Sequence, residues 1–232
     1  MPNGKVLIIG GHSGIGRAVS ELLNKQRPDI PEMEQYVPDK QTLDVESRST
    51  VERVIREEGP FTHIIYSAGL NRLAWVYDRS ISFLMEDMFY VNCSGFVGVV
   101  SAHVRIWEGA PLSVVAVSSD AARIPMRGSV AYCASKAALE AAVRCMAREM
   151  APVHRINAVA PGMVEGTPMT EYIDRTIPKF RDWSPEYARE YERSGTPTGR
   201  RATLAEVAET IVWVLTGPEQ MTGAIIDING GR

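Results

Sequence analysis

The chain has 232 residues, of which 45% are hydrophobic and 23% charged, and its formal net charge is -3. This composition is ordinary for a soluble globular protein, and the small negative charge gives no reason to expect a nucleic acid or an anionic membrane surface as partner. The three cysteines and four histidines show no metal-ligand spacing. We therefore expect reduced thiols, a cytoplasmic location and no metal site. The N-terminus lacks a signal-peptide pattern, and we expect no segment of membrane-spanning length.

A glycine-rich turn lies near the start of the chain, between a predicted strand over residues 6–9 and a predicted helix over 14–25. It reads Gly10-Gly11-His12-Ser13-Gly14-Ile15-Gly16. Glycines at these positions let backbone approach a pyrophosphate, and the helix N-terminus offers free N–H groups and a partial positive charge. The turn predicts an anionic dinucleotide as ligand; the alternative is a glycine-rich turn with a structural role only.

The rest of the chain alternates strands and helices without repeats or long linkers. Apolar runs predict strands over 35–37, 62–66, 113–117, 155–159 and 224–228. Helices are predicted over 47–58, 81–107, 130–150 and 204–215. This βαβ order indicates one α/β domain over residues 1–232, built on a doubly wound parallel sheet of the Rossmann type.

Tyr132 and Lys136 lie four residues apart on the predicted helix 130–150 and so share one face of it. An ammonium beside a phenol favours the phenolate, so we expect Lys136 to lower the pKa of Tyr132 toward working pH. Ser119 lies thirteen residues upstream of the tyrosine, just after a predicted strand. Its neighbour Ser118 is the alternative hydroxyl donor. Alone, the Tyr132 and Lys136 pair is also common on the surface of an amphipathic helix.

Taken in order, these motifs resemble those of the short-chain dehydrogenase/reductase family. The resemblance rests on Gly10 to Gly16, Asp44-Val45, Ser67-Ala68-Gly69, Asn92, Ser119, Tyr132 with Lys136, and Pro161-Gly162. It covers nearly the whole chain. It implies an NAD(P)-dependent oxidoreductase that moves a hydride between a nicotinamide cofactor and a secondary alcohol or ketone of a small organic substrate. It also implies a homotetramer or homodimer formed through the helices over 81–107 and 130–150.

The same resemblance implies roles for individual residues. Tyr132 would transfer the substrate proton, Ser119 would donate to the substrate oxygen, and Lys136 would also bind the nicotinamide ribose. Asn92 would serve a water-mediated proton relay, with a helix-kink role as the alternative. The implied cofactor-binding residues are Gly10, His12, Ser13, Gly14, Ile15, Gly16, Asp44, Val45, Ser67, Ala68, Gly69, Tyr132, Lys136, Pro161, Gly162, Val164 and Thr167.

The chain departs from the family pattern at single residues and in one segment. Ile9 and Ser67 stand where the family has threonine and asparagine, so hydrogen bonds that brace the central strands are replaced or missing. Only 27 residues separate Gly16 from Asp44. A strand over 35–37 leaves too few residues for a crossover helix to a further parallel strand, which needs about a dozen. We expect the family's third strand and its helix to be missing or vestigial.

The shortened segment also bears on the choice of cofactor. An acidic residue beyond the glycine turn accepts from the ribose 2′-OH of NAD, whereas a basic residue favours the 2′-phosphate of NADP. Asp39 is the acidic candidate, and Ser13 adds no positive charge, which favours NAD. Lys40 and Arg17 would favour NADP, and Asp39 is also an ordinary turn residue.

Residues 163–203 combine aromatic and charged side chains, which predicts a helical substrate-binding lid. Its apolar face would cover a partly apolar or cyclic substrate, or it would simply dock on the core. Two further functions stay open. One is enoyl reduction, epimerisation or dehydration on the same scaffold, and the other is NAD(P) sensing without turnover.

Overall fold

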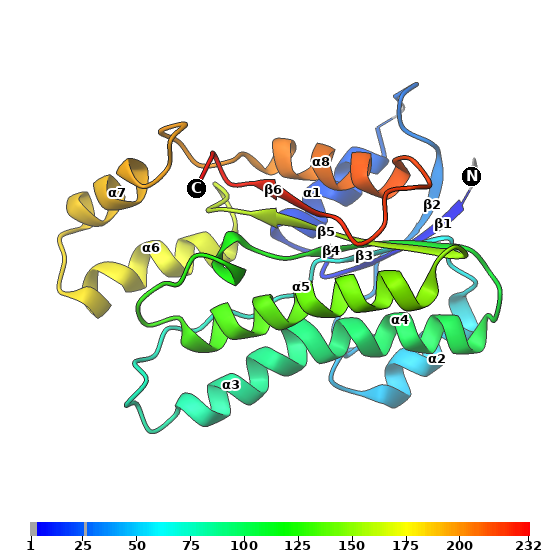
Figure 1. Cartoon of the computed structure of the whole chain (residues 1–232), viewed down its shortest axis with the longest axis horizontal. Helices are drawn as coiled ribbons and strands as arrows, with labels where there is room; N and C mark the ends of the chain where they lie inside the picture. The colour runs from blue at the N-terminus through cyan, green and yellow to red at the C-terminus, as the bar shows by residue number, and fades with distance from the viewer. Residues whose placement is uncertain (1–3, 26) are drawn as a thin grey trace.

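The computed structural model describes residues 4–25 and 27–232, so residues 1–3 of the predicted domain lie outside the description. One parallel sheet of six strands forms the centre of the molecule (Figure 1). Its strands follow the order β2-β1-β3-β4-β5-β6. Their bounds are β1 (Gly4–Ile9), β2 (Met33–Tyr36), β3 (His63–Tyr66), β4 (Leu112–Val117), β5 (His154–Pro161) and β6 (Ile225–Ile228). The predicted doubly wound α/β fold is confirmed.

Helices cover both faces of the sheet. Figure 1 shows α1 (Gly14–Leu23) and α8 (Leu204–Thr216) on one face, and α2 (Arg48–Glu58), α4 (Gly95–Ile106) and α5 (Val130–Met150) on the other. The helix α3 (Ile81–Phe89) runs into α4 through the π-helical turn η1 (Tyr90–Ser94). A 3₁₀ turn, η2 (Asp120–Ala122), follows β4, and α6 (Pro168–Arg181) and α7 (Pro185–Ser194) precede α8.

The alternation of side chains along the strands produces two hydrophobic cores. On β1, Leu7 and Ile9 pack into the core beneath α2, α4 and α5, whereas Val6 and Ile8 pack into the core beneath α1 and α8. Successive residues of a strand point to opposite faces, so a strand covered on both faces must be apolar throughout. This explains why the run over residues 6–9 shows no polar alternation.

The predicted loss of the third strand is confirmed. After β2 ends at Tyr36, residues 37–47, all of them described, contain no strand and no helix. A turn closes there, with the Leu43 amide donating to the Asp39 carbonyl at 2.9 Å, and α2 then leads directly to β3. The sheet consequently ends at β2.

The predicted helix over 81–107 forms as a nearly continuous rod, but the expectation that no segment reaches membrane-spanning length is wrong. The helical stretch Ile81–Ile106 is 26 residues long and contains an 18-residue window with a mean hydropathy of 1.2, which meets that length and composition. In the structure the rod packs against neighbours: α3 lies on α5, and α4 lies on α2. One third of this apolar window is buried, and the residues that enter the core beneath the sheet, among them Phe96, Val99 and Val100, lie on α4.

Candidate active site

A cavity of about 510 Å³ opens at the carboxyl ends of the central strands. There β1 has β2 on one side and β3 on the other, with α1 and α2 on opposite faces of the sheet. Such a change of direction in a parallel sheet opens a crevice for ligands. All the predicted site residues line this cavity except Gly16 and Asn92; they are Gly10, His12, Ser13, Gly14, Ile15, Asp39, Asp44, Val45, Ser67, Ala68, Gly69, Ser119, Tyr132, Lys136, Pro161, Gly162, Val164 and Thr167.

The glycine turn between β1 and α1 has the geometry of a backbone cradle. Gly10 has a φ of 78°, and a side-chain carbon added there would lie 2.7 Å from the Ala68 amide nitrogen. A side chain at Gly16 would lie 2.4 Å from the Gly10 carbonyl oxygen, which explains its place behind the cavity wall. Ser13, Gly14 and Ile15 at the start of α1 line the cavity, and the first N–H groups of a helix are free, so the turn fits a dinucleotide pyrophosphate.

Tyr132 and Lys136 project from the first turns of α5, and both side chains are buried. The Tyr132 hydroxyl donates to Met169 Sδ at 3.8 Å, and the Lys136 Nζ donates to the Val117 carbonyl at 2.8 Å. Burial raises the pKa of Tyr132 to about 12 and lowers the pKa of Lys136 to about 8. The expectation that the pKa of Tyr132 is lowered toward working pH is therefore wrong in this structure, because burial raises it and Lys136 is not among the groups that shift it.

The hydroxyl of Ser119 lies between η2 and the phenol. It accepts from the Ala121 amide at 3.2 Å and donates to Asp120 Oδ1 at 3.4 Å. The Ser119 side chain acts to lower the pKa of Tyr132, against the larger effect of burial. Ser118, the alternative donor, instead gives its proton to Glu140 Oε1 at 3.1 Å. The geometry favours Ser119 as the hydroxyl next to the reacting group.

Asn92 sits in the π-helical turn behind the cavity and is fully buried. Its Oδ1 accepts from the Leu70 amide at 2.7 Å, and its Nδ2 donates to the Leu70 carbonyl and to Ser135 Oγ, each at 2.9 Å. The side chain thereby ties the loop after β3 to α5. These contacts account for a positioning role, and the predicted proton relay stays a prediction.

Asp39 and Lys40 line the opposite end of the cavity. The Asp39 carboxylate is exposed and accepts from the Thr42 amide at 2.7 Å, which lowers the pKa of this side chain. Lys40 Nζ lies 3.1 Å from Glu46 Oε2, so its charge is already paired. Asp39 therefore caps a turn and lines the cavity at once.

Thr167 lies beside the glycine turn and directly before α6. Its side chain caps α6 by accepting from the Thr170 amide at 3.0 Å, and Pro168 at the first helical position favours the same start. A side-chain carbon added at Gly14 would lie 3.6 Å from Thr167 Cβ, so α6 begins beside the cradle.

The predicted lid segment forms two helices, α6 and α7. Met169, Ile173 and Ile177 of α6 line the cavity. On α7, Tyr187 and Tyr191 pack around Trp183 and remain exposed.

The sequence motifs did not predict several polar residues that line the cavity; these are Asn71, Asp120, Arg181 and Arg232. Asp120 pairs with Arg232 at 3.2 Å. Asn71 Oδ1 and Arg181 Nε are buried without a hydrogen-bond partner among the described residues. In the sequence, the four-residue spacing of Ile173, Ile177 and Arg181 could have indicated that Arg181 shares a helix face with the two isoleucines. No group of three metal-ligating side chains occurs within residues 4–25 and 27–232.

Comparison with known proteins supports one family. The family model described as "Enoyl-(Acyl carrier protein) reductase" matches residues 35–232. The 3-oxoacyl-[acyl-carrier-protein] reductase FabG of Thermotoga maritima is 30% identical, with 98% of this chain and 97% of the relative covered. The cis-1,2-dihydrobenzene-1,2-diol dehydrogenase of Pseudomonas putida is 26% identical, with 97% and 90% covered.

Solved structures share the fold. A short chain dehydrogenase family protein from Francisella tularensis superposes with a TM-score of 0.80 at 24% identity, covering 99% of this chain and 98% of that chain. A small-chain dehydrogenase in complex with NADPH gives 0.79 at 23% identity, with the same coverage. The fold and the site define a nicotinamide-dependent oxidoreductase that acts on CH–OH groups. The chain belongs to the short-chain dehydrogenase/reductase family.

Proposed function

We propose that this protein reduces a ketone to a secondary alcohol, and catalyses the reverse oxidation, with Tyr132 as the proton-transfer group. One observation carries the proposal: the protonated phenol, the Ser119 hydroxyl and the Lys136 ammonium line one cavity with the glycine cradle. When bound, the nicotinamide supplies or accepts the hydride. Tyr132 gives its proton to the substrate oxygen in reduction and takes it back in oxidation.

The neighbours of Tyr132 have separate tasks in this proposal. Ser119 donates to the substrate oxygen as negative charge develops there, which stabilises the transition state. Lys136 brings positive charge to the same end of the cavity and binds the nicotinamide ribose. The apolar side chains of α6 exclude water from the reacting centre, and residues 163–203 form the lid that covers it.

NAD is the preferred cofactor in this proposal. The Asp39 carboxylate is ionised and exposed at the end of the cavity where the adenosine ribose would lie. It would accept from a 2′-OH and repel a 2′-phosphate. Lys40 does not offset this repulsion well, because Glu46 already pairs with it.

The proposal includes the oligomeric state of the enzyme and its location in the cell. A homodimer or homotetramer through the rod of α3 and α4 and through α5 is in keeping with the family. Cys93, Cys133 and Cys145 are all free thiols, which supports a reducing cytoplasm.

Turnover of a substrate panel tests the proposed function. The panel contains ketones, secondary alcohols and an enoyl thioester, each measured by nicotinamide absorbance with NAD(H) and with NADP(H). We expect ketone reduction, a higher kcat/KM with NADH than with NADPH, and little reduction of the enoyl thioester. Preferential reduction of the thioester would favour enoyl reduction instead. Binding of the cofactor without turnover of any panel member would favour a sensing role, and strong NADPH preference would rule out the role of Asp39.

A further inference from the structure

One face of α6 leads from the reacting centre to an arginine. Met169, which accepts from the Tyr132 hydroxyl, begins this face, and Ile173, Ile177 and Arg181 continue it at four-residue intervals. All four side chains line the same cavity as Tyr132. Residues four apart lie above one another on a helix, so the cavity has an apolar wall with a guanidinium at its far end.

Apart from Lys136 at the reacting centre and Arg181, the lysine and arginine side chains that line the cavity are paired with carboxylates. Lys40 lies 3.1 Å from Glu46, and Arg232 lies 3.2 Å from Asp120. Arg181 makes no ion pair with a carboxylate among the described residues; its Nη2 donates to the Arg127 carbonyl at 2.9 Å. Its guanidinium carbon also lies 5.0 Å from the centre of the Trp183 ring. These two contacts hold the side chain in place while its charge stays unneutralised.

Two further observations indicate that Arg181 lacks an anion. Its Nε is buried without an acceptor among the described residues, and a buried donor left unpaired is costly. Burial lowers the pKa of Arg181; Tyr191 acts against this lowering, and the nearby guanidinium of Arg127 adds to it. Arg127 packs on the Trp75 ring, at 5.5 Å from its centre, and forms no ion pair within residues 4–25 and 27–232. An anion placed here would relieve both unfavourable effects.

The pyrophosphate of the cofactor is not this anion. The glycine cradle lies beside Thr167, at the start of α6, whereas Arg181 ends the helix. At about 1.5 Å per residue, these two ends are roughly 20 Å apart along the helix axis. The anionic group must therefore belong to the molecule that also reaches Tyr132.

We propose that the substrate is an elongated hydroxy or keto compound with an anionic end, a carboxylate or a phosphate, which Arg181 binds. Its carbonyl lies at Tyr132, its apolar middle lies on Ile173 and Ile177, and its anion lies at Arg181. Arginine binds planar carboxylates and phosphate oxygens through paired N–H donors. This inference rests on the proposed function, since it assigns the substrate of that same cavity.

A matched set of ketones tests the inference. Linear keto acids of short, medium and long chain, with the ketone at the penultimate carbon, are compared with their methyl esters and with phosphate monoesters of equal length. We measure kcat/KM for the wild-type protein, for Arg181→Gln and for Arg175→Gln. Arg175 is the matched control, because it is an exposed arginine of the same helix that donates only to the Glu171 carbonyl and does not line the cavity.

For the wild type and for Arg175→Gln, we expect anionic ketones of sufficient length to exceed their esters by about 10- to 100-fold in kcat/KM. In Arg181→Gln the ratio of kcat/KM for the anionic ketone to kcat/KM for its ester should fall to near one. Because both substrates are measured with the same variant, a general loss of activity does not change this ratio. The carboxylate and phosphate arms identify which anion is preferred. An unchanged ratio in Arg181→Gln, or equal turnover of acid and ester by the wild type, would overturn the inference and leave the proposed function standing.

Failure of the proposed function has a different signature. If the wild type reduces neither acids nor esters, the proposed function fails, and calorimetric titration of the long keto acid then tests the anion site alone. Binding to the wild type that is lost in Arg181→Gln supports the site, and absence of binding to the wild type overturns it.

Discussion

For Tyr132, the local motif predicts where the side chain lies, whereas the surrounding residues determine its pKa. The spacing to Lys136 identified a pair of residues that line one cavity, but it gave the wrong direction for the pKa of the phenol. Burial raises that pKa to about 12, because the charged form of a group loses hydration in the interior. Met169 and the segment after β4 cover the phenol and so cause this loss of hydration. Both are distant from Tyr132 in sequence, so the local motif could not predict their effect.

The raised pKa of Tyr132 predicts opposite requirements for the two directions of the reaction. Reduction needs the neutral phenol, which is the dominant form well below about pH 12. Oxidation needs the phenolate, whose fraction rises about tenfold per pH unit below that pKa. We expect kcat/KM for alcohol oxidation to increase between about pH 6 and pH 9, while kcat/KM for ketone reduction does not increase. A profile for oxidation that is flat or falls over this range contradicts the assignment.

Asn92 illustrates what can be predicted at the scale of an element. The apolar pattern predicted the helix over 81–107 to within a residue at its C-terminal end. It did not predict the π-helical turn, because that turn is stabilised by Leu70 and Ser135, which are distant in sequence. π-Helical turns inside α-helices are frequent at functional sites. The same limit applies to Arg181, whose importance depends on the walls of the cavity rather than on its own helix.

The helix α4 carries a buried histidine that makes stability depend on pH. His103 Nε2 accepts from the Phe61 amide at 3.1 Å, so the ring must be neutral, and burial lowers the pKa of His103 to about 4. The unfolded chain has a pKa near 6.5 and therefore binds more protons between about pH 6.5 and pH 4. Stability falls as the pH falls through this window, and the loss reaches about 3 kcal/mol at about pH 4, the pKa of His103 in the folded chain.

Urea unfolding across this pH range tests the role of His103. In His103→Gln, whose amide oxygen can accept from Phe61, the loss of unfolding free energy on acidification should be smaller by about 2–3 kcal/mol than in the wild type. His12→Gln, at an exposed residue, serves as the control. An equal acid sensitivity in His103→Gln and the wild type would contradict this explanation.

At the scale of the whole molecule, the sheet could be predicted almost completely from the sequence. The βαβ order indicated the parallel sheet, and the short distance between Gly16 and Asp44 indicated that it ends at β2. Both follow from chain length and apolar pattern. The substrate could not be predicted in this way, since the cavity wall combines α6, the loop after β3 and η2.

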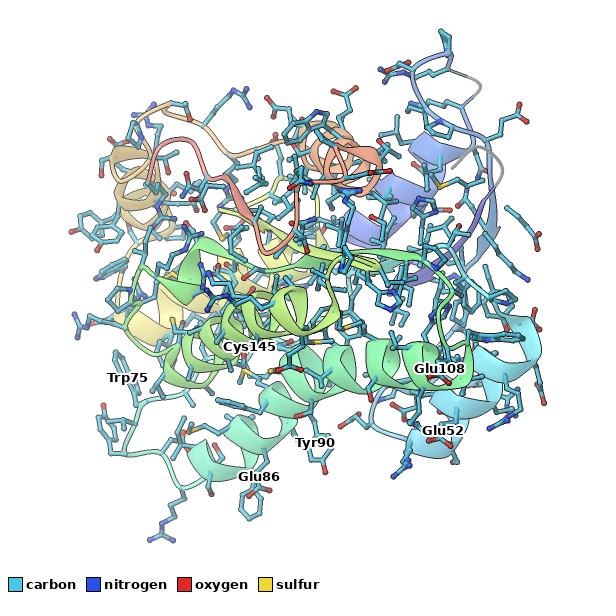
Figure 2. The ribbon with its side chains drawn as sticks, turned by 45° about the vertical axis from the view of Figure 1, so that its right-hand side comes forward. Glu52, Trp75, Glu86, Tyr90, Glu108 and Cys145 are labelled. Atoms are coloured by element: carbon cyan, nitrogen blue, oxygen red, sulfur yellow. The ribbon has the colours of Figure 1, made fainter. Side chains whose placement is uncertain are left out.

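The proposed assembly places α3, α4 and α5 at contacts between subunits. Figure 2 shows Glu86 and Tyr90 on the outer side of the rod formed by α3 and α4, and the Tyr90 side chain is 54% exposed. A side chain added at Gly98 of α4 would meet no atom outside its own helix within 4 Å. Arginine also favours helix more than glycine does, by up to about 1 kcal/mol.

The Gly98→Arg variant should therefore fold as the wild type does, but its subunits should no longer associate through α4. Light scattering should report a dimer or tetramer for the wild type and a smaller species for Gly98→Arg, with an unchanged circular dichroism spectrum. A monomeric wild type contradicts the proposed assembly. An unchanged mass for Gly98→Arg contradicts the placement of α4 at the contact.

The central claim is that the Tyr132 hydroxyl transfers the substrate proton, and Tyr132→Phe tests it most directly. This variant removes one oxygen and keeps the ring that packs against Met88, Ala121 and Ala131. With the best ketone of the panel, we expect kcat to fall by about 10²- to 10⁴-fold, while NADH binding by fluorescence is retained. Tyr187→Phe, at an exposed tyrosine outside the cavity, should keep full activity. If Tyr132→Phe keeps most of its turnover, the phenol does not transfer the proton and the account is wrong.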